Sequence, residues 1–323
     1  MRNGSRLRRF DAALNAFLVS RRALGRAVQL DEYVLRRLRA HLARTGAADL
    51  NARSFGRWRR CLRHCAHNTQ LDWAMMVHRF CRYRRRSEPR SFLPERWTLG
   101  RHRPYPLPTP IEAEQVRRLL AYASHRPCNR ARILPHAAQR LAVVLMYTAG
   151  LRRGEVARLC VEDVDPDTGV LRITASKFHK SRWVPLSASA ARELRAYLRI
   201  RKECVPRSAH NHRLLCSRAV RGYSSEALGK SVHTLMRRSG IWAGSARIPR
   251  VHDFRHAFAV AALRRWYEAG CDVQSELPKL SLYMGHVSIV STSYYLRCMP
   301  AVVHLASKRF ALACSGLLDG GDA

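Results

Sequence analysis

The sequence predicts a mainly α-helical protein of two domains, the second of which carries a small antiparallel β-meander. Apolar residues recur at three- and four-residue intervals over most of the chain, which is the pattern of amphipathic helices. A proline-rich segment interrupts that pattern at residues 104–110, and a turn flanked by short β-branched runs begins at Asp165. The length of 323 residues also exceeds what one hydrophobic core usually spans, so two domains are expected.

Residues 1–103 are predicted to form a small helical bundle. Four stretches carry apolar side chains at i, i+3 or i+4, and i+7, so each has one apolar helical face. These positions are Leu14/Phe17/Leu18, Val34/Leu35/Leu38/Leu42, Phe55/Trp58/Leu62/Cys65 and Trp73/Met76/Val77/Phe80. We expect the four faces to pack into one core and to leave the arginines between them on a basic outer surface.

The segment 104–110 is predicted to be the linker between the two domains. It has proline at every second position, which forbids a helix and favours an extended chain of roughly 20 Å. The next helix is expected to begin here with a capping box, in which Thr109 is the N-cap, Pro110 the first helical residue and Glu112 the third.

The second domain is predicted to span residues 111–313, with a flexible Gly-rich tail over 314–323. Helices are expected over 111–123 and 137–149. Strands are expected near 170–175 and 182–186, beside the turn Asp165-Pro-Asp-Thr-Gly169. The remaining helical segments are expected over 188–202, 225–239, 252–268, 275–284 and 288–297, with a final amphipathic stretch over 302–313.

The composition indicates a polyanionic partner. The chain carries 59 Lys and Arg against 23 Asp and Glu, a net charge of +36 at pH 7. A surface this basic is typical of nucleic-acid-binding proteins. The candidate phosphate contacts of the first domain are Arg53, Arg57, Arg60, Arg82, Arg84, Arg85 and Arg86.

The cysteines and the apolar segments predict a cytoplasmic protein that is associated with the nucleoid when it binds DNA. The ten cysteines lack the short, dense spacing of secreted disulfide-rich proteins. No segment has the pattern of a signal peptide or the length of a bilayer span. Cys61, His64, Cys65 and His67 have no second cysteine pair at a zinc-finger distance, so no metal site is predicted there.

An ordered set of polar residues in the second domain suggests phosphodiester chemistry through a tyrosine. Cleaving a phosphodiester without a metal requires a nucleophile, cationic donors around the non-bridging oxygens, and a proton for the leaving oxygen. The set consists of Arg152 in Thr148-Ala-Gly-Leu-Arg-Arg-Gly-Glu155, Lys177 in Ser176-Lys-Phe-His-Lys180, His252 and Arg255 in His252-Asp-Phe-Arg-His256, His286 in Met284-Gly-His286, and Tyr295.

This ordered set resembles the catalytic domain of the tyrosine recombinase/integrase family. In that family an Arg follows a Gly-Leu pair, a Lys lies in a β-hairpin, a His-x-x-Arg starts a helix, and a Gly-His precedes the nucleophilic Tyr by nine residues. All these spacings occur here, and the resemblance covers roughly residues 107–312. It implies a helical, SAM-like core-binding domain over 1–103 and a tyrosine-recombinase catalytic domain over 111–313.

The resemblance also implies the role of each residue. Tyr295 is expected to be the nucleophile and to form a 3′-phosphotyrosyl ester, and Lys177 to protonate the leaving 5′ oxygen. Two neighbours remain open as alternatives, Tyr294 for the nucleophile and Lys180 for the acid. The expected phosphate clamp and its supports are Arg152 and Arg255, with Glu155 orienting the clamp and His252 and His286 transferring protons or binding the phosphate.

The function that follows from the resemblance is site-specific DNA recombination without metal, ATP or a cofactor, in the manner of transposon- or integron-borne enzymes. The expected partners are double-stranded DNA with inverted-repeat core sites, an accessory protein or second recombinase, and further copies of the chain in a DNA-bound tetramer joined through 302–313. Two alternatives stay open: a non-catalytic DNA-binding regulator on the same fold, and a relaxing enzyme similar to type IB topoisomerases.

Overall fold

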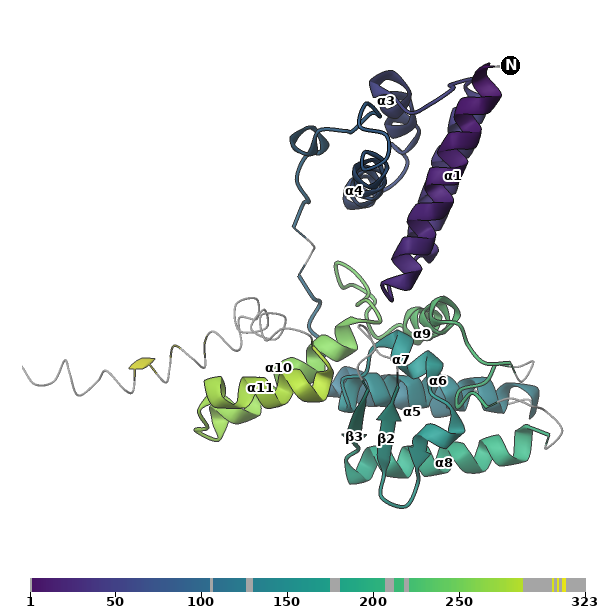
Figure 1. Ribbon diagram of the computed structural model, residues 1–323. Coiled ribbons are helices and arrows are strands. Elements are labelled where there is room, and N and C mark those ends of the chain that lie inside the picture. The colour runs from purple at the N-terminus through teal and green to yellow at the C-terminus, as the bar shows by residue number, and fades with distance from the viewer. Residues whose placement is uncertain are drawn as a thin grey trace, which may run out of the picture. The chain divides into compact units, whose positions relative to one another are not determined.

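The computed structural model describes residues 2–104, 107–125, 130–174, 181–206, 212–217, 221–286, 304, 307 and 310–311. They belong to two compact units, residues 1–106 and 107–323, and the division falls inside the proline-rich segment 104–110 (Figure 1). No helix of the described ranges combines the length and the apolar character that crossing a membrane requires.

The N-terminal unit is the predicted helical bundle. Its elements are α1 (Arg2–Ala23), α2 (Gln29–Arg44), α3 (Ala52–Cys61), α4 (His67–Arg84) and a 3₁₀ turn η1 (Arg96–Leu99). Phe80 lies at the centre of the core, where the rings of Phe10 and Phe17 meet it edge to face at centroid distances of 5.2 and 5.7 Å. The four predicted helices are confirmed, although Cys65 lies beyond the end of α3 and is only half-buried.

Arg84 corrects the prediction for the basic surface. Its guanidinium donates to Asp49 at 2.5 and 2.9 Å and to Glu88 at 2.6 and 3.1 Å, and lies over the ring of Phe10. The residue is 4 % exposed, so its donors are used inside the bundle and the prediction of a phosphate contact is wrong for Arg84. The other six predicted arginines are exposed, and their role stays a prediction: Arg53, Arg57, Arg60, Arg82, Arg85 and Arg86.

The C-terminal unit is built around α6. Its elements are α5 (Ala113–His125), α6 (Arg130–Thr148), α7 (Arg153–Arg158), η2 (Val161–Asp163), β1 (Val164–Asp165), β2 (Val170–Ile173), β3 (Arg182–Pro185), α8 (Ala188–Cys204), α9 (Ser225–Ser239), α10 (Asp253–Glu268) and α11 (Val273–Met284). Helix α6 contacts α5, α8, α9 and α10, and its Leu141, Leu145 and Met146 are fully buried. Helices α10 and α11 lie side by side and share a smaller apolar cluster (Figure 1).

The predicted β-meander is confirmed. The strands are antiparallel in the order β1-β2-β3, with Leu171 opposite Val184 in the register of β2 and β3. The side chain of Asp165 accepts from the backbone N–H groups of Asp167 and Thr168, and Gly169 takes the positive φ of +69° that closes this turn. Arg182, the first residue of β3, is the register partner of the buried Ile173 of β2, so β3 begins next to Ile173.

The start of α5 corrects the predicted capping box. The helix begins at Ala113, and the Thr109 hydroxyl accepts a hydrogen bond from Arg247 Nε at 2.8 Å instead of capping it. The backbone N–H of Glu112 donates to the side chain of Gln115 at 3.0 Å, which supplies the cap three residues later than predicted. The Thr109 prediction was wrong because a distant arginine competes for its oxygen.

Two predicted helical segments, 288–297 and most of 302–313, lie outside the described residues. The short helix α7 was not predicted, since six residues are too few to show a periodicity. Helix α6 begins at Arg130, seven residues before its predicted start at 137, and the remaining helices lie within about two residues of their predicted ranges; α9 matches its range of 225–239.

We expect Arg84→Ala to destabilise the N-terminal unit by about 2 to 3 kcal/mol. This loss of unfolding free energy lies at or below the range for breaking a buried ion pair. The side chains of Asp49 and Glu88 are 32 % and 35 % exposed, so water can solvate their carboxylates once the arginine is removed. Calorimetric unfolding of the full chain measures the effect. Arg82→Ala, on the exposed face of the same helix, is the matched control and should stay within about 0.5 kcal/mol; equal effects of the two substitutions would contradict the structural role.

Candidate active site

Glu155 and Arg152 meet at the start of α7. The backbone N–H of Arg152 donates to Glu155 Oε2 at 2.9 Å, and its guanidinium NH1 donates to Oε1 at 2.8 Å. A carboxylate at the N-terminal end of a helix is also favoured by the helix dipole. The three-residue spacing of the Arg and the Glu thus forms a cap that fixes the orientation of the Arg152 side chain.

A second arginine, Arg182 of β3, shares the same carboxylate. Its NH1 and NH2 donate to Glu155 Oε1 and Oε2 at 3.1 and 2.9 Å, and the side chain of Glu155 is 1 % exposed. Burial alone would raise the pKa of Glu155, but the hydrogen bonds and positive charges of Arg182 and Arg152 outweigh it and lower the pKa to about 2. Glu155 is therefore ionised throughout the neutral range.

His252 and Arg255 come from the first turn of α10, as their three-residue spacing predicted. Arg255 is 1 % exposed, and its guanidinium donates to the backbone carbonyls of Gly150 and, at 2.8 Å, of Met284. Gly150 has a φ of +60°, and a Cβ there would lie 2.5 Å from the ring of Phe258. Only glycine lets the chain before Arg152 approach α10 this closely.

Three arginines converge on the C-terminal end of α11, where backbone carbonyls lack helical partners. Arg182 Nε donates to the carbonyl of Tyr283 at 2.7 Å, and Arg255 NH2 to that of Met284 at 2.8 Å. Arg152 NH2 donates to the carbonyl of Gly285 at 2.8 Å, and its NH1 lies 3.4 Å from that of Met284. Gly285 ends the helix in the left-handed conformation with φ +68°, and the next residue, His286, lies within range of the charges of these three guanidinium groups.

Burial and the arginine charges keep both predicted histidines neutral at physiological pH. Burial is the main cause for His252, and together with nearby His256 and Arg255 it lowers the pKa to about 4. For His286, burial and then the charges of Arg255, Arg152 and Arg182 lower the pKa to about 3. A neutral imidazole is a proton acceptor, so these residues are suited to accept a proton or a hydrogen bond.

The site carries more positive than negative charge. Among the described residues, the three guanidinium groups of Arg152, Arg182 and Arg255 surround one carboxylate, that of Glu155. Asp253 is also buried nearby, but it pairs with Arg250 at 3.0 Å. An anion placed here would find preorganised donors and would raise the pKa of both histidines.

The structure brings together five of the seven predicted catalytic residues: Arg152, Glu155, His252, Arg255 and His286. Lys177 and Tyr295, with their alternatives Lys180 and Tyr294, lie outside the described residues. Sequence reasoning missed Arg182. The available signal was strand alternation: the buried Val184 faces the core, so Arg182 two residues earlier must face inward as well, and a buried arginine requires hydrogen-bond acceptors.

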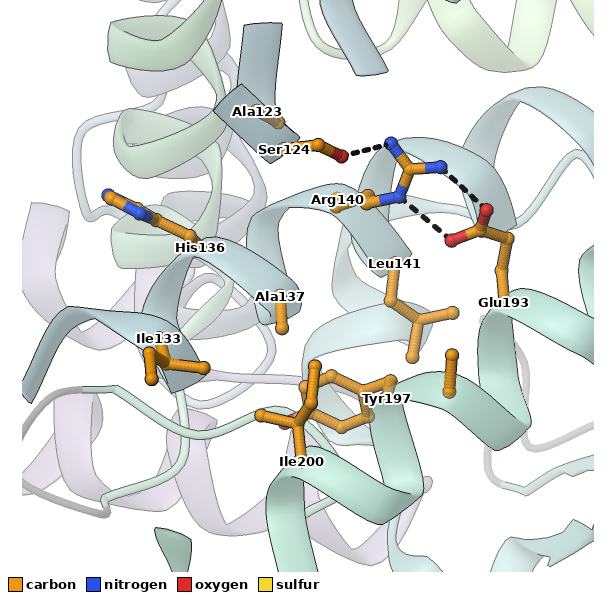
Figure 2. A pocket seen from close by; sticks show the side chains of 11 residues that line it. Ala123, Ser124, Ile133, His136, Ala137, Arg140, Leu141, Glu193, Tyr197 and Ile200 are labelled. Carbon is orange, nitrogen blue, oxygen red and sulfur yellow. Dashed lines mark hydrogen bonds and ion pairs between the residues drawn. The ribbon is translucent and has the colours of Figure 1, made fainter. Parts of the chain in front are cut away.

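A separate cavity of about 290 Å³ lies between α5, α6 and α8 (Figure 2). Most of its lining residues are apolar, and Arg140, which also lines it, makes a bidentate ion pair with Glu193 at 2.6 and 2.8 Å. None of the predicted site residues lines it. No cluster of His, Cys, Asp or Glu in the described ranges has the size to hold a metal ion.

The Phage integrase family model matches residues 110–300. The putative integrase/recombinase y4rB of Sinorhizobium fredii is 36 % identical over 237 residues, which cover 71 % of this chain and 74 % of that protein. The tyrosine recombinase XerA of Thermococcus kodakarensis is 31 % identical over 60 % of each chain.

Solved structures share the fold. The Tn1549 transposon integrase in complex with circular intermediate DNA aligns with a TM-score of 0.64 at 15 % identity, over 93 % of this chain and 99 % of that one. The XerH site-specific recombinase bound to palindromic difH substrate aligns with a TM-score of 0.60 at 16 % identity, over 88 % and 78 %. At these identities the likeness concerns the backbone arrangement.

We expect Gly285→Ala to destabilise the C-terminal unit more than Gly240→Ala. Both glycines end a helix in the left-handed conformation, at φ +68° and +65°, so both substitutions cost about 1 to 2 kcal/mol of backbone strain. A Cβ at Gly285 would also lie 2.7 Å from Arg182 NH1, whereas nothing lies within 4 Å of one at Gly240. Urea unfolding of the full chain measures the difference, and equal losses would contradict close packing of Arg182 on Gly285.

Proposed function

The chain belongs to the phage integrase family and is a tyrosine-type site-specific recombinase, and on that premise we propose that it cleaves and rejoins DNA through a 3′-phosphotyrosyl intermediate on Tyr295, without metal or ATP. One observation carries the proposal: Arg152, Arg255 and the neutral His252 and His286 converge on one point with excess positive charge. A phosphodiester group supplies the negative charge and the acceptor oxygens that this arrangement lacks.

The chemistry follows from the protonation states. The phenolic oxygen of Tyr295 attacks the phosphorus, the bond to the 5′ oxygen breaks, and a 3′-phosphotyrosyl ester and a free 5′ hydroxyl result. The tyrosine proton passes to one of the neutral histidines, and Lys177 donates a proton to the departing oxygen. Attack of a 5′ hydroxyl on the ester reverses these steps, so the bond energy is conserved.

Arg152 and Arg255 stabilise the transition state in this scheme. Negative charge on the non-bridging oxygens grows as the fifth oxygen approaches the phosphorus, and forked guanidinium donors match two oxygens at once. Because protein groups already hold both guanidinium groups in place, little reorganisation is needed when the phosphate arrives. This preorganisation is what supports the assignment of the two arginines to the clamp.

The DNA partner is proposed to be a duplex with inverted-repeat core sites, held by both basic units. The exposed arginines of α3 and α4 are the proposed backbone contacts of the N-terminal unit, as a core-binding domain. Further copies of the chain, joined through residues 302–313, are proposed to form a tetramer on two such sites. The fold shared with a transposon integrase supports a role in a mobile element, and an accessory or second recombinase fits the same scheme.

We predict that Tyr295→Phe abolishes covalent protein–DNA adducts on a nicked suicide substrate and leaves DNA binding intact, since only the nucleophilic oxygen is removed. Denaturing electrophoresis detects the adduct. Tyr294→Phe is the matched control and should retain it. If only Tyr294→Phe loses the adduct, the nucleophile is one residue earlier; if the wild-type chain forms none on any core site, a non-catalytic DNA-binding role replaces the proposed function.

We predict that Lys177→Ala slows cleavage of an all-oxygen substrate by about 10² to 10⁴-fold and that a 5′-bridging phosphorothiolate restores the rate. The sulfur leaves without being protonated, so the acid becomes dispensable. Single-turnover cleavage of both substrates measures the effect, with Lys180→Ala as the control. Rescue of Lys180→Ala instead of Lys177→Ala would transfer the role to Lys180.

A further inference from the structure

Arg182 lies on the inward-facing side of strand β3, where an arginine is unusual. Strand β3 alternates, so Arg182 and Val184 face inward while Trp183 and Pro185 face outward. The Arg182 side chain is 8 % exposed, and each of its three nitrogens donates to the protein: Nε to the Tyr283 carbonyl, and NH1 and NH2 to Glu155. Because a bidentate ion pair with Glu155 already matches its charge, Arg182 is poorly placed to bind a phosphate itself.

The contacts of Arg182 join three segments that are far apart in the sequence. Glu155 lies 27 residues before it, on α7, and Tyr283 lies 101 residues after it, at the end of α11. Through Glu155 it reaches Arg152, whose side chain remains 23 % exposed and so can meet a ligand. Through the Tyr283–Gly285 backbone it reaches His286. Lys177, the proposed acid, precedes Arg182 by five residues.

We propose that Arg182 is a positioning residue for strand cleavage, which neutralises Glu155 and anchors the end of α11 so that Arg152 and His286 are aimed at the phosphate. The proposal rests on the proposed function above and adds a residue to its machinery. Arg182 acts through its neighbours and does not touch the reacting atoms.

Charge sharing explains why a second arginine is needed. A buried carboxylate must be balanced, and with Arg152 as its only partner it would hold that guanidinium in a closed ion pair. Arg182 provides a bidentate partner for both oxygens of Glu155, so Arg152 keeps one contact to Oε1 and directs NH2 toward the end of α11. Arg152 can then turn its remaining hydrogen-bond capacity to a phosphate without leaving Glu155 unbalanced.

Close packing makes the anchor rigid. A Cβ on Gly285 would lie 2.7 Å from Arg182 NH1 and 3.0 Å from its Cζ, so the guanidinium rests directly on the backbone that precedes His286. Tyr283 is held from its other end as well, because its hydroxyl donates to the carbonyl of Pro185 at 3.0 Å on the same strand. Strand β3 and the end of α11 are therefore joined at two points.

The test compares Arg182→Met with Arg140→Met in the full-length protein. Arg140 is the matched control because it makes the same kinds of contact, a bidentate pair with Glu193 and a bond to the Leu120 carbonyl, away from the site (Figure 2). On a half-site suicide substrate we expect Arg182→Met to cleave about 10²-fold more slowly, as a misplaced catalytic group does, with half-site affinity changed by less than about threefold. Arg140→Met should stay within about threefold of wild type in both measurements.

Two further readouts separate positioning from a loss of stability. A 5′-bridging phosphorothiolate should leave Arg182→Met slow, because the defect lies in the clamp and not in the leaving-group acid. The acid limb of the pH–rate profile of Arg182→Met should also move to higher pH. His286 faces Arg255, Arg152, Arg182 and His252, and the loss of the Arg182 charge raises the pKa of His286. His286 is then protonated at a higher pH than in the wild type. Arg182→Lys, which keeps the charge without the fork, should slow cleavage without moving that limb.

The outcomes distinguish this proposal from the proposed function. Cleavage by Arg182→Met at the wild-type rate, rescue by the phosphorothiolate, or an equal loss in Arg140→Met would overturn the positioning role while Tyr295 chemistry stands. If Arg182→Met does not fold, the same measurements on Arg182→Lys decide: a wild-type rate overturns the role, and a slow rate without phosphorothiolate rescue supports it. A wild-type chain that forms no adduct on any core site would instead overturn the proposed function, and adduct formation by Tyr295→Phe would move the nucleophile to Tyr294.

Discussion

One buried carboxylate, that of Glu155, organises the catalytic unit. It caps the start of α7 through the Arg152 backbone, holds the Arg152 side chain, and ties β3 to the same point through Arg182. Burying a carboxylate is unfavourable unless its oxygens are paired, and both arginines contribute to pairing those of Glu155. The position of the end of α11 follows, because the same two arginines donate to its carbonyls.

The charge balance of the site explains how a protein with a strongly basic surface directs that charge to one reaction. The net charge of +36 attracts any nucleic acid but does not select a phosphate. Selecting one phosphate requires hydrogen-bond donors that are fixed in place and shielded from water, and Arg255, at 1 % exposure, is such a donor. The neutral His252 and His286 add acceptors among these cations, a combination that the exposed arginines of α3 and α4 do not offer.

The sequence predicted those features that depend on local spacing. Periodicity gave the helices, and the offsets from Arg152 to Glu155 and from His252 to Arg255 placed each pair correctly because i and i+3 are neighbours at a helix start. Partners that are distant in sequence were not predictable: Arg182 binds groups 27 and 101 residues away, Arg84 finds Asp49 across the bundle, and Arg247 takes the Thr109 oxygen. An arginine-rich chain hides such pairs, since most of its arginines are exposed.

The backbone carbonyls at the end of α11 allow three arginines to lie close together in one phosphate site. Guanidinium groups placed side by side repel one another, and carboxylates that relieved the repulsion would also neutralise the site. Backbone carbonyls avoid this, because they orient a donor with a partial charge and add no net charge. Arg152, Arg182 and Arg255 donate to three successive carbonyls, from Tyr283 to Gly285, so the cluster is held open and remains cationic until an anion binds.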